Sequence, residues 1–242
     1  MTDFHKTPSD VRHARVLAVR AMLAERGLSA LIIPSADPHM SEYLPVYWQG
    51  RAWLSGFTGS VGTLVITQDF AGVWTDSRYW VQAPIELDGT GIELQKMEQA
   101  RPTYAKFLAD NLPQGAKVAI DGAVLSVAEF DSLSQAFAER GIQLVIDADV
   151  LGQIWQDRPS LPNAPIYVHD EVFVDTSAKQ KLAQVREVMT QKGAAHHLIS
   201  SLDDIAWLTN LRGADVNFNP VFLSHLFITA DTATLFVHDD KL

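Results

Sequence analysis

The chain has 242 residues, with 19 Lys+Arg against 29 Asp+Glu and a formal net charge of −10. This length allows one large domain or two small ones, and 47% hydrophobic with 20% charged residues is the composition of an ordinary soluble globular protein. The acidic balance argues against nucleic acid as a partner, because phosphate backbones are bound mainly by Lys and Arg. With no cysteine, disulfides, thiolate zinc sites, iron–sulfur clusters and a cysteine nucleophile are excluded.

The N-terminal residues are polar where a secretory signal would need an apolar run. The chain also has no stretch approaching the ~20 apolar residues that span a bilayer. We therefore expect a protein without a targeting or membrane segment, located in the cytoplasm.

A helix is predicted from Ser9 to Gly27, where a glycine suits the C-cap position. Its apolar residues recur at helical spacing: Val11, Val16, Val19 and Leu23. A buried strand is expected at residues 30–33. The long polar and aromatic loop over residues 35–50 is more than a scaffold needs, and such loops often carry function.

Residues 53–74 contain two β-rich runs, 63–67 and 72–74, separated by glycines and Asp69. Antiparallel strands fit this segment best. Asp76 and Ser77 then offer N-caps for a helix that runs through Gln82. Pro84 is expected to shorten or kink that helix.

The following elements alternate in the same way: a helix opened by Pro102-Thr103, a strand at 117–120, a helix from Ser126 to Gly141, and a strand at 143–146. Ser126 and Glu129 have the spacing of a capping box. Helices that alternate with apolar strands predict an α/β fold, with a mixed β-sheet flanked by helices.

The segment RPSLPNAP places three prolines between Arg158 and Pro165 and predicts a domain boundary. We expect a first domain over residues 1–160 and a second over 161–242. After the boundary, an amphipathic helix is predicted over 179–192, closed by Gly193, and an apolar segment follows over 194–199.

This order repeats the beginning of the chain. Each helix-ending glycine is followed by serine at +8 and aspartate at +10: Ser35 and Asp37 after Gly27, Ser201 and Asp203 after Gly193. Each copy continues with an apolar stretch, a strand, a threonine and a second strand. The matches predict a duplicated domain. Because the first copy continues well beyond its second strand, we expect the second copy to be incomplete.

Two groups of residues suggest chemistry that their context disfavours. The histidines fit no metal motif and are interpreted as ordinary core or surface residues: His5, His13, His39, His169, His196, His197, His225 and His238. The glycine-rich run 56–62 precedes a strand, whereas a phosphate-binding loop leads into a helix. We interpret this run as a tight turn between strands, and a nucleotide-binding enzyme is disfavoured for the same reason.

Two polar clusters are better candidates for function. Residues 37–43, with Arg51 behind them, follow a buried strand, where α/β sheets place ligand-facing loops. Residues 75–79 follow another strand, although their spacing alone favours N-capping by Asp76 or Ser77 with Arg78 solvated. Asp37, His39 and Glu42 crowd into a single loop and would make a poor metal site.

Four segments carry a specific resemblance: ALIIPSADPHMSEY, RAWLSGFTGSVGTLVIT, VWTDSRYWVQA and SLDDIAWLTNLRGADVNFNPVF. Together they resemble the N-terminal region of three-domain Xaa-Pro aminopeptidases (aminopeptidase P), in the creatinase/prolidase superfamily. The resemblance implies two creatinase N-terminal-type domains ahead of a pita-bread catalytic domain that is absent from this chain. It also implies removal of the N-terminal residue from peptides with proline in second position.

In that family two metal ions, typically manganese, are held by Asp, His and Glu of the catalytic domain. We therefore expect no catalytic residue, no metal ligand and no cofactor in this chain, which alone would be inactive. The family also implies a homo-oligomer, typically a dimer, with proline-containing peptides as ligands.

We expect the two polar clusters to line the approach to the active site, and the candidate substrate-binding residues are His39, Tyr43, Arg51 and Arg78. The alternative is a free-standing binding or scaffold module that has the creatinase N-terminal fold without peptidase activity. Whether the reading frame continues into a ligand-bearing domain distinguishes the two.

Overall fold

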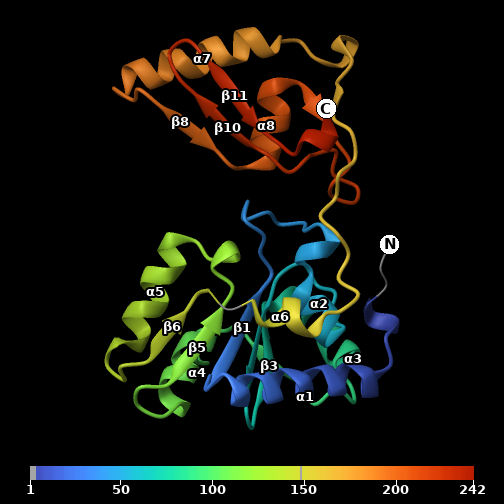
Figure 1. The fold of residues 1–242 in the computed structure, drawn as a ribbon, viewed down its shortest axis with the longest axis vertical. Helices are drawn as coiled ribbons and strands as arrows, with labels where there is room; N and C mark the ends of the chain where they lie inside the picture. The colour runs from blue at the N-terminus through green and yellow to red at the C-terminus, as the bar shows by residue number, and fades with distance from the viewer. Residues whose placement is uncertain (1–3, 148) are drawn as a thin grey trace. The chain divides into compact units, whose positions relative to one another are not determined.

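The computed structural model describes residues 4–147 and 149–242. The chain forms two compact units (Figure 1). Unit 1 contains the residues up to Pro38 together with Tyr47–Pro159, and unit 2 contains His39–Val46 and Ser160–Leu242. In the described part of the chain, no helix combines the length and apolar character needed to cross a membrane.

Unit 1 is built on a six-stranded sheet with the order β4-β3-β2-β1-β5-β6. The strands are β1 Ala30–Pro34, β2 Thr63–Thr67, β3 Ala71–Thr75, β4 Glu93–Lys96, β5 Lys117–Ile120 and β6 Gln143–Val145. The β1–β2 and β2–β3 pairs are antiparallel. The β1–β5, β5–β6 and β3–β4 pairs are parallel. The predicted mixed α/β fold is therefore confirmed.

Helices flank this sheet (Figure 1). They are α1 Ser9–Glu25, α2 Gly50–Ser55, α3 Gln82–Glu86, α4 Tyr104–Asn111, α5 Val127–Ala138 and α6 Val150–Ile154. In the two units together, short 3-10 turns occur at Phe4–Lys6, Val46–Trp48, Ser77–Tyr79, Gly122–Val124, Glu171–Phe173 and Asp239–Lys241. The core-facing stripe of α1 differs in one position from its prediction: Val11 is exposed, and the neighbouring Arg12 is buried instead.

One part of the core of unit 1 lies between the sheet and the helices α4 and α5. Alternate strand residues such as Ile32, Val65 and Ile120 pack here against Leu133 and Phe137, all of them buried. Successive strand residues point to opposite faces of a sheet, so the intervening residues of β1 and β2 face the α1 side.

Two predictions about the segments around β2 and β3 were wrong in detail. Trp53 lies in α2, and the glycine-rich run therefore connects a helix to a strand, with Gly56 as the left-handed C-cap at φ 76°. After Asp76 the helix is broken into a 3-10 turn and α3. Pro84 lies in the first turn of α3, where a missing N–H costs no hydrogen bond.

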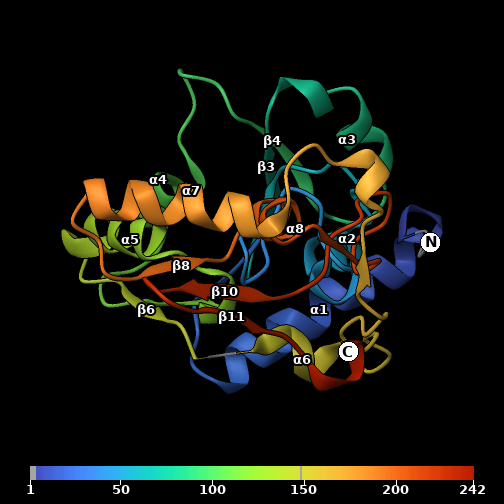
Figure 2. The same cartoon turned by 90° about the horizontal axis from the view of Figure 1, so that it is seen from above.

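In unit 2, helix α7 (Ala178–Gln191) runs alongside the strands of a small sheet (Figure 2). That sheet has the order β11-β10-β8, all antiparallel, with β8 His197–Ile199, β10 His225–Ile228 and β11 Ala233–Phe236. The other elements are α8 Leu202–Thr209 and a two-stranded ladder of β7 Tyr167–Val168 and β9 Leu211–Arg212. Ser177 and Gln180 form a capping box at the start of α7.

The two units repeat one arrangement down to the strand register. Leu31 pairs with Ile66 in unit 1, and the corresponding His197 pairs with Ile228 in unit 2. The side chain of Arg20 in α1 donates to the Thr67 carbonyl at 3.1 Å. Arg186 in α7 donates to the corresponding Thr229 carbonyl at 2.9 Å. The order deduced from glycine, serine and aspartate spacing is thus a structural repeat.

We expect limited proteolysis with a nonspecific protease to cleave the chain first within residues 160–165. This segment has no regular secondary structure and is mostly exposed, which favours cleavage. Mass spectrometry of the first fragments tests this division. Initial cleavage within β2 or β3, with the linker intact, would contradict it.

Candidate functional site

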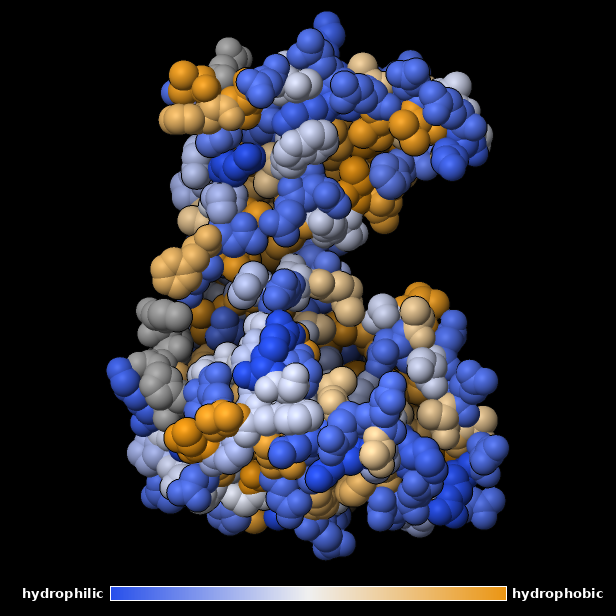
Figure 3. Space-filling view, turned by 180° about the vertical axis from the view of Figure 1, so that it is seen from behind, coloured by the Kyte–Doolittle hydropathy of each residue, from blue (hydrophilic) through white to orange (hydrophobic). Residues whose placement is uncertain are grey.

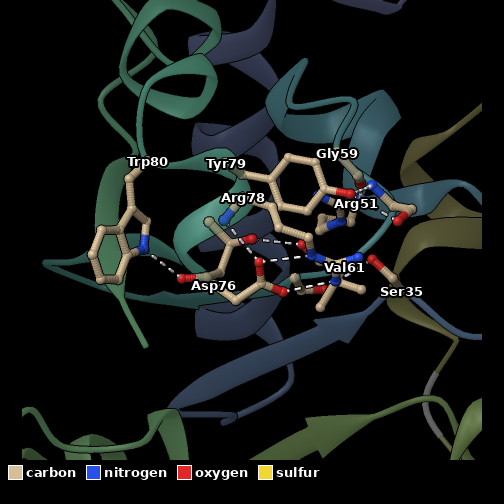
Figure 4. A network of polar contacts seen from close by, with 11 residues as sticks. Ser35, Arg51, Gly59, Val61, Asp76, Arg78, Tyr79 and Trp80 are labelled. Atoms are coloured by element: carbon tan, nitrogen blue, oxygen red, sulfur yellow. Dashed lines mark hydrogen bonds and ion pairs between the residues drawn. The ribbon is translucent and has the colours of Figure 1, made fainter. Parts of the chain in front are cut away.

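The first candidate site is the end of β1 and β3 in unit 1, where the glycine-rich loop of residues 56–62 crosses. The Ser35 hydroxyl donates to the Gly62 carbonyl at 3.0 Å, and the Thr75 hydroxyl donates to the Val61 carbonyl at 2.7 Å (Figure 4). The loop is therefore tied to both strands. Two N–H groups of the loop are engaged as well, because Thr58 N–H donates to Glu86 and Ser60 N–H donates to the Tyr79 hydroxyl, so these donors are not free to cradle a phosphate.

Tyr79 closes the loop from the other side. Its hydroxyl accepts from the Ser60 N–H at 3.2 Å and shares a hydrogen bond of 2.8 Å with the Ser60 hydroxyl. Its ring packs edge-on against Phe57. A Cβ at Gly59 would lie 2.5 Å from the Phe57 ring and 2.7 Å from the Tyr79 ring. Only glycine fits here without displacing an aromatic ring.

Arg51 occupies the interior of this site. It lies in α2, is only 5% exposed, and donates to the Gly59 carbonyl while its guanidinium stacks 4.6 Å from the Phe57 ring centroid. Burial lowers its pKa to about 10, an effect that Tyr79 and Glu86 oppose. It stays protonated at neutral pH. Its Nε and Nη1 have no hydrogen-bond partner among the described residues.

Arg78 lies on the exposed side of the same network. Its Nε and Nη2 donate to the two carboxylate oxygens of Asp76 at 3.0 and 2.8 Å. These hydrogen bonds lower the pKa of Asp76. Asp76 also accepts from the Arg78 N–H as the N-cap of the 3-10 turn. The capping role weighed from the sequence is real, and it leaves the arginine side chain 56% exposed.

The other two candidate residues, His39 and Tyr43, belong to unit 2. The His39 ring lies 4.6 Å from that of His225, and its Nδ1 donates to the Ser200 carbonyl at 3.0 Å. The Ser200 hydroxyl in turn bonds His225 Nδ1 at 2.9 Å. Tyr43 is exposed.

Tyr43 lines a cleft of about 170 Å³ within unit 2. The remaining lining residues are Ser41, Glu42, Leu202, Asp203, Val216, Asn219 and Val221. The structure therefore places Arg51 and Arg78 in the same network of unit 1. It places His39 and Tyr43 in unit 2. The roles of Ser200 and His225 could not be found from the sequence, because these residues lie more than 150 positions from His39.

The residues described here do not fit the metal centre implied by the resemblance. Within residues 4–147 and 149–242, no group of three or more His, Asp or Glu could hold a metal ion. Asp37 is buried in unit 1, whereas His39 and Glu42 belong to unit 2. The side chain of His5 lies outside the described part of the structure.

Two α/β units in tandem, with polar loops at their strand ends, define an α/β scaffold of known type. Residues 15–152 and 157–242 each match a family model described as the creatinase/prolidase N-terminal domain. The chain belongs to the creatinase/prolidase N-terminal domain family.

Its relatives are longer proteins. The chain is 37% identical over 237 residues to Xaa-Pro aminopeptidase 1 of Dictyostelium discoideum, covering 94% of this chain and 38% of the relative. It is 38% identical to human Xaa-Pro aminopeptidase 2, covering 93% of this chain and 34% of that protein. The chain thus spans less than two fifths of the length of these relatives.

A solved structure is similar to this chain. The X-prolyl aminopeptidase of Caenorhabditis elegans, described as a cytosolic enzyme with a di-nuclear active site, superposes with a TM-score of 0.88 at 30% identity. The match covers 96% of this chain and 39% of that enzyme. The predicted family and the tandem of N-terminal domains are confirmed.

Proposed function

We propose that the chain is the non-catalytic N-terminal portion of a cytoplasmic, metal-dependent Xaa-Pro aminopeptidase. The enzyme would remove the N-terminal residue from peptides with proline in second position. The observation that carries this proposal is the 37% identity over 94% of the chain to an Xaa-Pro aminopeptidase. The proposed division of the portion into domains 1–160 and 161–242 rests on the proline-rich linker.

The proposed role of this portion is to shape the approach to the active site and to support a homo-oligomer. Arg78 and Tyr43 are exposed and offer donors for the carbonyls or the C-terminal carboxylate of a peptide. His39 holds the loop that carries Tyr43 against Ser200 and His225. Arg51 supports the site by holding the glycine-rich loop, while its Nε and Nη1, which have no hydrogen-bond partner among the described residues, are buried.

Proline in second position leaves the scissile amide without an N–H. Recognition must therefore use the proline ring and the flanking carbonyls. N–H and O–H donors of this portion can contact those carbonyls. Two divalent metal ions, manganese in the proposed enzyme, would supply the attacking hydroxide and polarise the carbonyl. Those ions would be held by the proposed catalytic domain, since the described residues of this chain form no group of three or more ligands.

We expect the purified chain to bind no stoichiometric manganese and to release no N-terminal residue from an Xaa-Pro peptide. The longer polypeptide encoded by the same gene is expected to bind manganese and to release the N-terminal residue of an Xaa-Pro peptide. Calorimetric titration with manganese and a peptide-release assay test this, with an Xaa-Ala peptide as the control substrate. A longer polypeptide that folds and binds manganese, yet leaves Xaa-Pro peptides intact, would contradict the proposed activity.

A further inference from the structure

Ser200 and His225 face each other at one end of the β8–β10 pair of unit 2. In that antiparallel pair, Leu226 lies opposite Ile199. Extending the register by one residue places His225 opposite Ser200, and side chains at opposed positions of a ladder are close neighbours. The Ser200 hydroxyl and His225 Nδ1 are 2.9 Å apart and share a hydrogen bond. The pair therefore follows from the strand register.

The segment 39–46 is held against this pair. It belongs to unit 2, although in the sequence it lies between β1 and α2 of unit 1. His39 Nδ1 donates to the Ser200 carbonyl oxygen at 3.0 Å, and the His39 and His225 rings lie 4.6 Å apart with an interplanar angle of 30°. Ser200 thus bonds one histidine through its carbonyl and the other through its hydroxyl.

The repeat in unit 1 shows that this strand end does not require such a pair. At the corresponding positions of the β1–β2 ladder, Pro34 lies opposite Thr63. Proline has no side-chain donor or acceptor, so no side-chain hydrogen bond forms between these two residues. The hydrogen-bonded pair of Ser200 and His225 is therefore particular to unit 2, and what it adds there is the attachment of His39.

The attached segment lines the cleft of about 170 Å³ in unit 2. Residues 41–43 line this cleft and follow His39 by two to four positions. Residues 202 and 203 of α8 line it too, and they follow Ser200 by two and three positions. The hydrogen bond between His39 and Ser200 therefore fixes these two stretches of the cleft relative to each other.

Met40 shows that the segment needs to be held. Its φ is 56°, a left-handed conformation that is costly for a residue with a Cβ. The Met40 side chain is exposed, so its own packing does not offset this cost. The contacts of neighbouring residues, and those of His39 directly before it, have to maintain the conformation.

We propose that Ser200 and His225 are positioning residues for peptide binding, which act through His39 on Tyr43. The Ser200 hydroxyl orients the His225 ring, and that ring supports His39. His39 in turn holds the segment that presents Tyr43 to the peptide. The inference rests on the proposed function, in which Tyr43 offers a donor to the peptide. It concerns peptide binding and not bond cleavage.

The Michaelis constant of the full-length enzyme tests this role. His225→Ala removes both the ring that packs on His39 and the hydrogen bond to Ser200. If the loosened segment keeps Tyr43 in place for roughly a tenth to a third of the time, apparent affinity falls by the same factor. KM should therefore rise about three- to tenfold while kcat changes less than about twofold.

Conservative variants should restore binding in a graded way. His225→Phe keeps a ring against His39 and should recover most of the affinity. Ser200→Ala removes only a hydroxyl and should raise KM less than His225→Ala does, whereas Ser200→Thr keeps the hydroxyl and should match the unchanged enzyme. Ser200→Ala also tests the inference if His225→Ala does not fold.

An exposed histidine of the same unit provides the matched control. Much of the surface drawn in Figure 3 is hydrophilic, and an exposed histidine is ordinary on such a surface. The His238 side chain is 68% exposed. His238→Ala should therefore leave KM unchanged.

A double-mutant cycle separates positioning from an independent contact. In a Tyr43→Ala background the effect of His225→Ala on KM should disappear, because the contact that His225 positions is already gone. An equal rise in KM in both backgrounds would overturn the inference. Unchanged KM in both His225→Ala and Ser200→Ala would overturn it as well.

Proteolysis of this chain gives a readout that does not depend on activity. A glutamate-specific protease can cut after Glu42, which is exposed, once the segment leaves its place. Mass spectrometry should show this cleavage to be about tenfold faster in His225→Ala than in the unchanged chain or in His238→Ala. Equal rates would overturn the inference. Faster cleavage at Glu42, with a full-length protein that leaves Xaa-Pro peptides intact, would support the anchoring by His225 and overturn the proposed activity.

Discussion

Replacing Lys241 by alanine is expected to lower the free energy of unfolding of unit 2 by about 3 to 5 kcal/mol, the usual cost of leaving one buried charge without its partner. The Lys241 side chain is 2% exposed, and its Nζ lies 2.7 Å from both carboxylate oxygens of Asp215. Asp215 also accepts from the Leu223 N–H at 2.7 Å. The pair therefore ties the end of the described chain to the loop before β10.

Thermal unfolding followed by circular dichroism measures this loss, and two variants provide controls. Lys106→Ala removes an exposed pair with Asp110 and should cost less than about 0.5 kcal/mol. The double variant Lys241→Met/Asp215→Asn keeps an acceptor for Leu223 without a buried charge, and should recover much of the loss. If Lys241→Ala were as mild as Lys106→Ala, the buried pair would not be important for stability.

Replacing Arg51 by alanine is expected to lower the free energy of unfolding of unit 1 by about 2 to 4 kcal/mol. The estimate combines a lost buried charged hydrogen bond with the cavity left beneath the Phe57 ring. Arg51→Met refills most of that volume and removes the buried charge, so it should cost much less. Chemical denaturation of the three proteins measures the difference.

The two Arg51 variants and Arg78→Ala, each made in the full-length enzyme, test the proposed roles in peptide binding. Arg78→Ala should leave stability nearly unchanged and raise KM more than it lowers kcat, because a remote contact binds substrate and transition state alike. The expected loss in kcat/KM is roughly ten- to hundredfold, the value of one charge-assisted hydrogen bond. Unchanged KM in Arg78→Ala would contradict peptide binding by Arg78. A raised KM in a stable Arg51→Met would show that Arg51 contributes to peptide binding, through the glycine-rich loop or by direct contact, beyond its contribution to stability.

Local sequence signals predicted most regular elements of unit 1 because they act over a few residues. The N-cap at Ser126 was correct, and the glycine that ends α1, Gly27 at φ 63°, lies one residue after the C-cap Arg26. The other half of the predicted capping box at Ser126 is replaced by a long-range contact, since Glu129 accepts from the Tyr104 hydroxyl. The apolar run around Trp53 was misread, because a short buried helix and a buried strand have the same composition.

The candidate residues show the same division. The positions of Asp76 and Arg78 at the end of a strand could be read from the sequence, because their turn is local. The burial of Arg51 could not, since it depends on Phe57, Gly59 and Tyr79 closing over it. The sequence likewise placed His39 in a loop without revealing its partners, Ser200 and His225.

By itself, the sequence determined the α/β class, the proline-rich linker, the repeated order of elements and the family, because each depends on periodicity or on motifs close together in the chain. Only the tertiary structure decided which apolar faces are covered. Leu198 and Ile32 occupy the same place in their repeats, but α4, α5 and β5 enclose only Ile32. Burial depends on which distant segments pack against a residue, and this information is not contained in the residue's own neighbourhood.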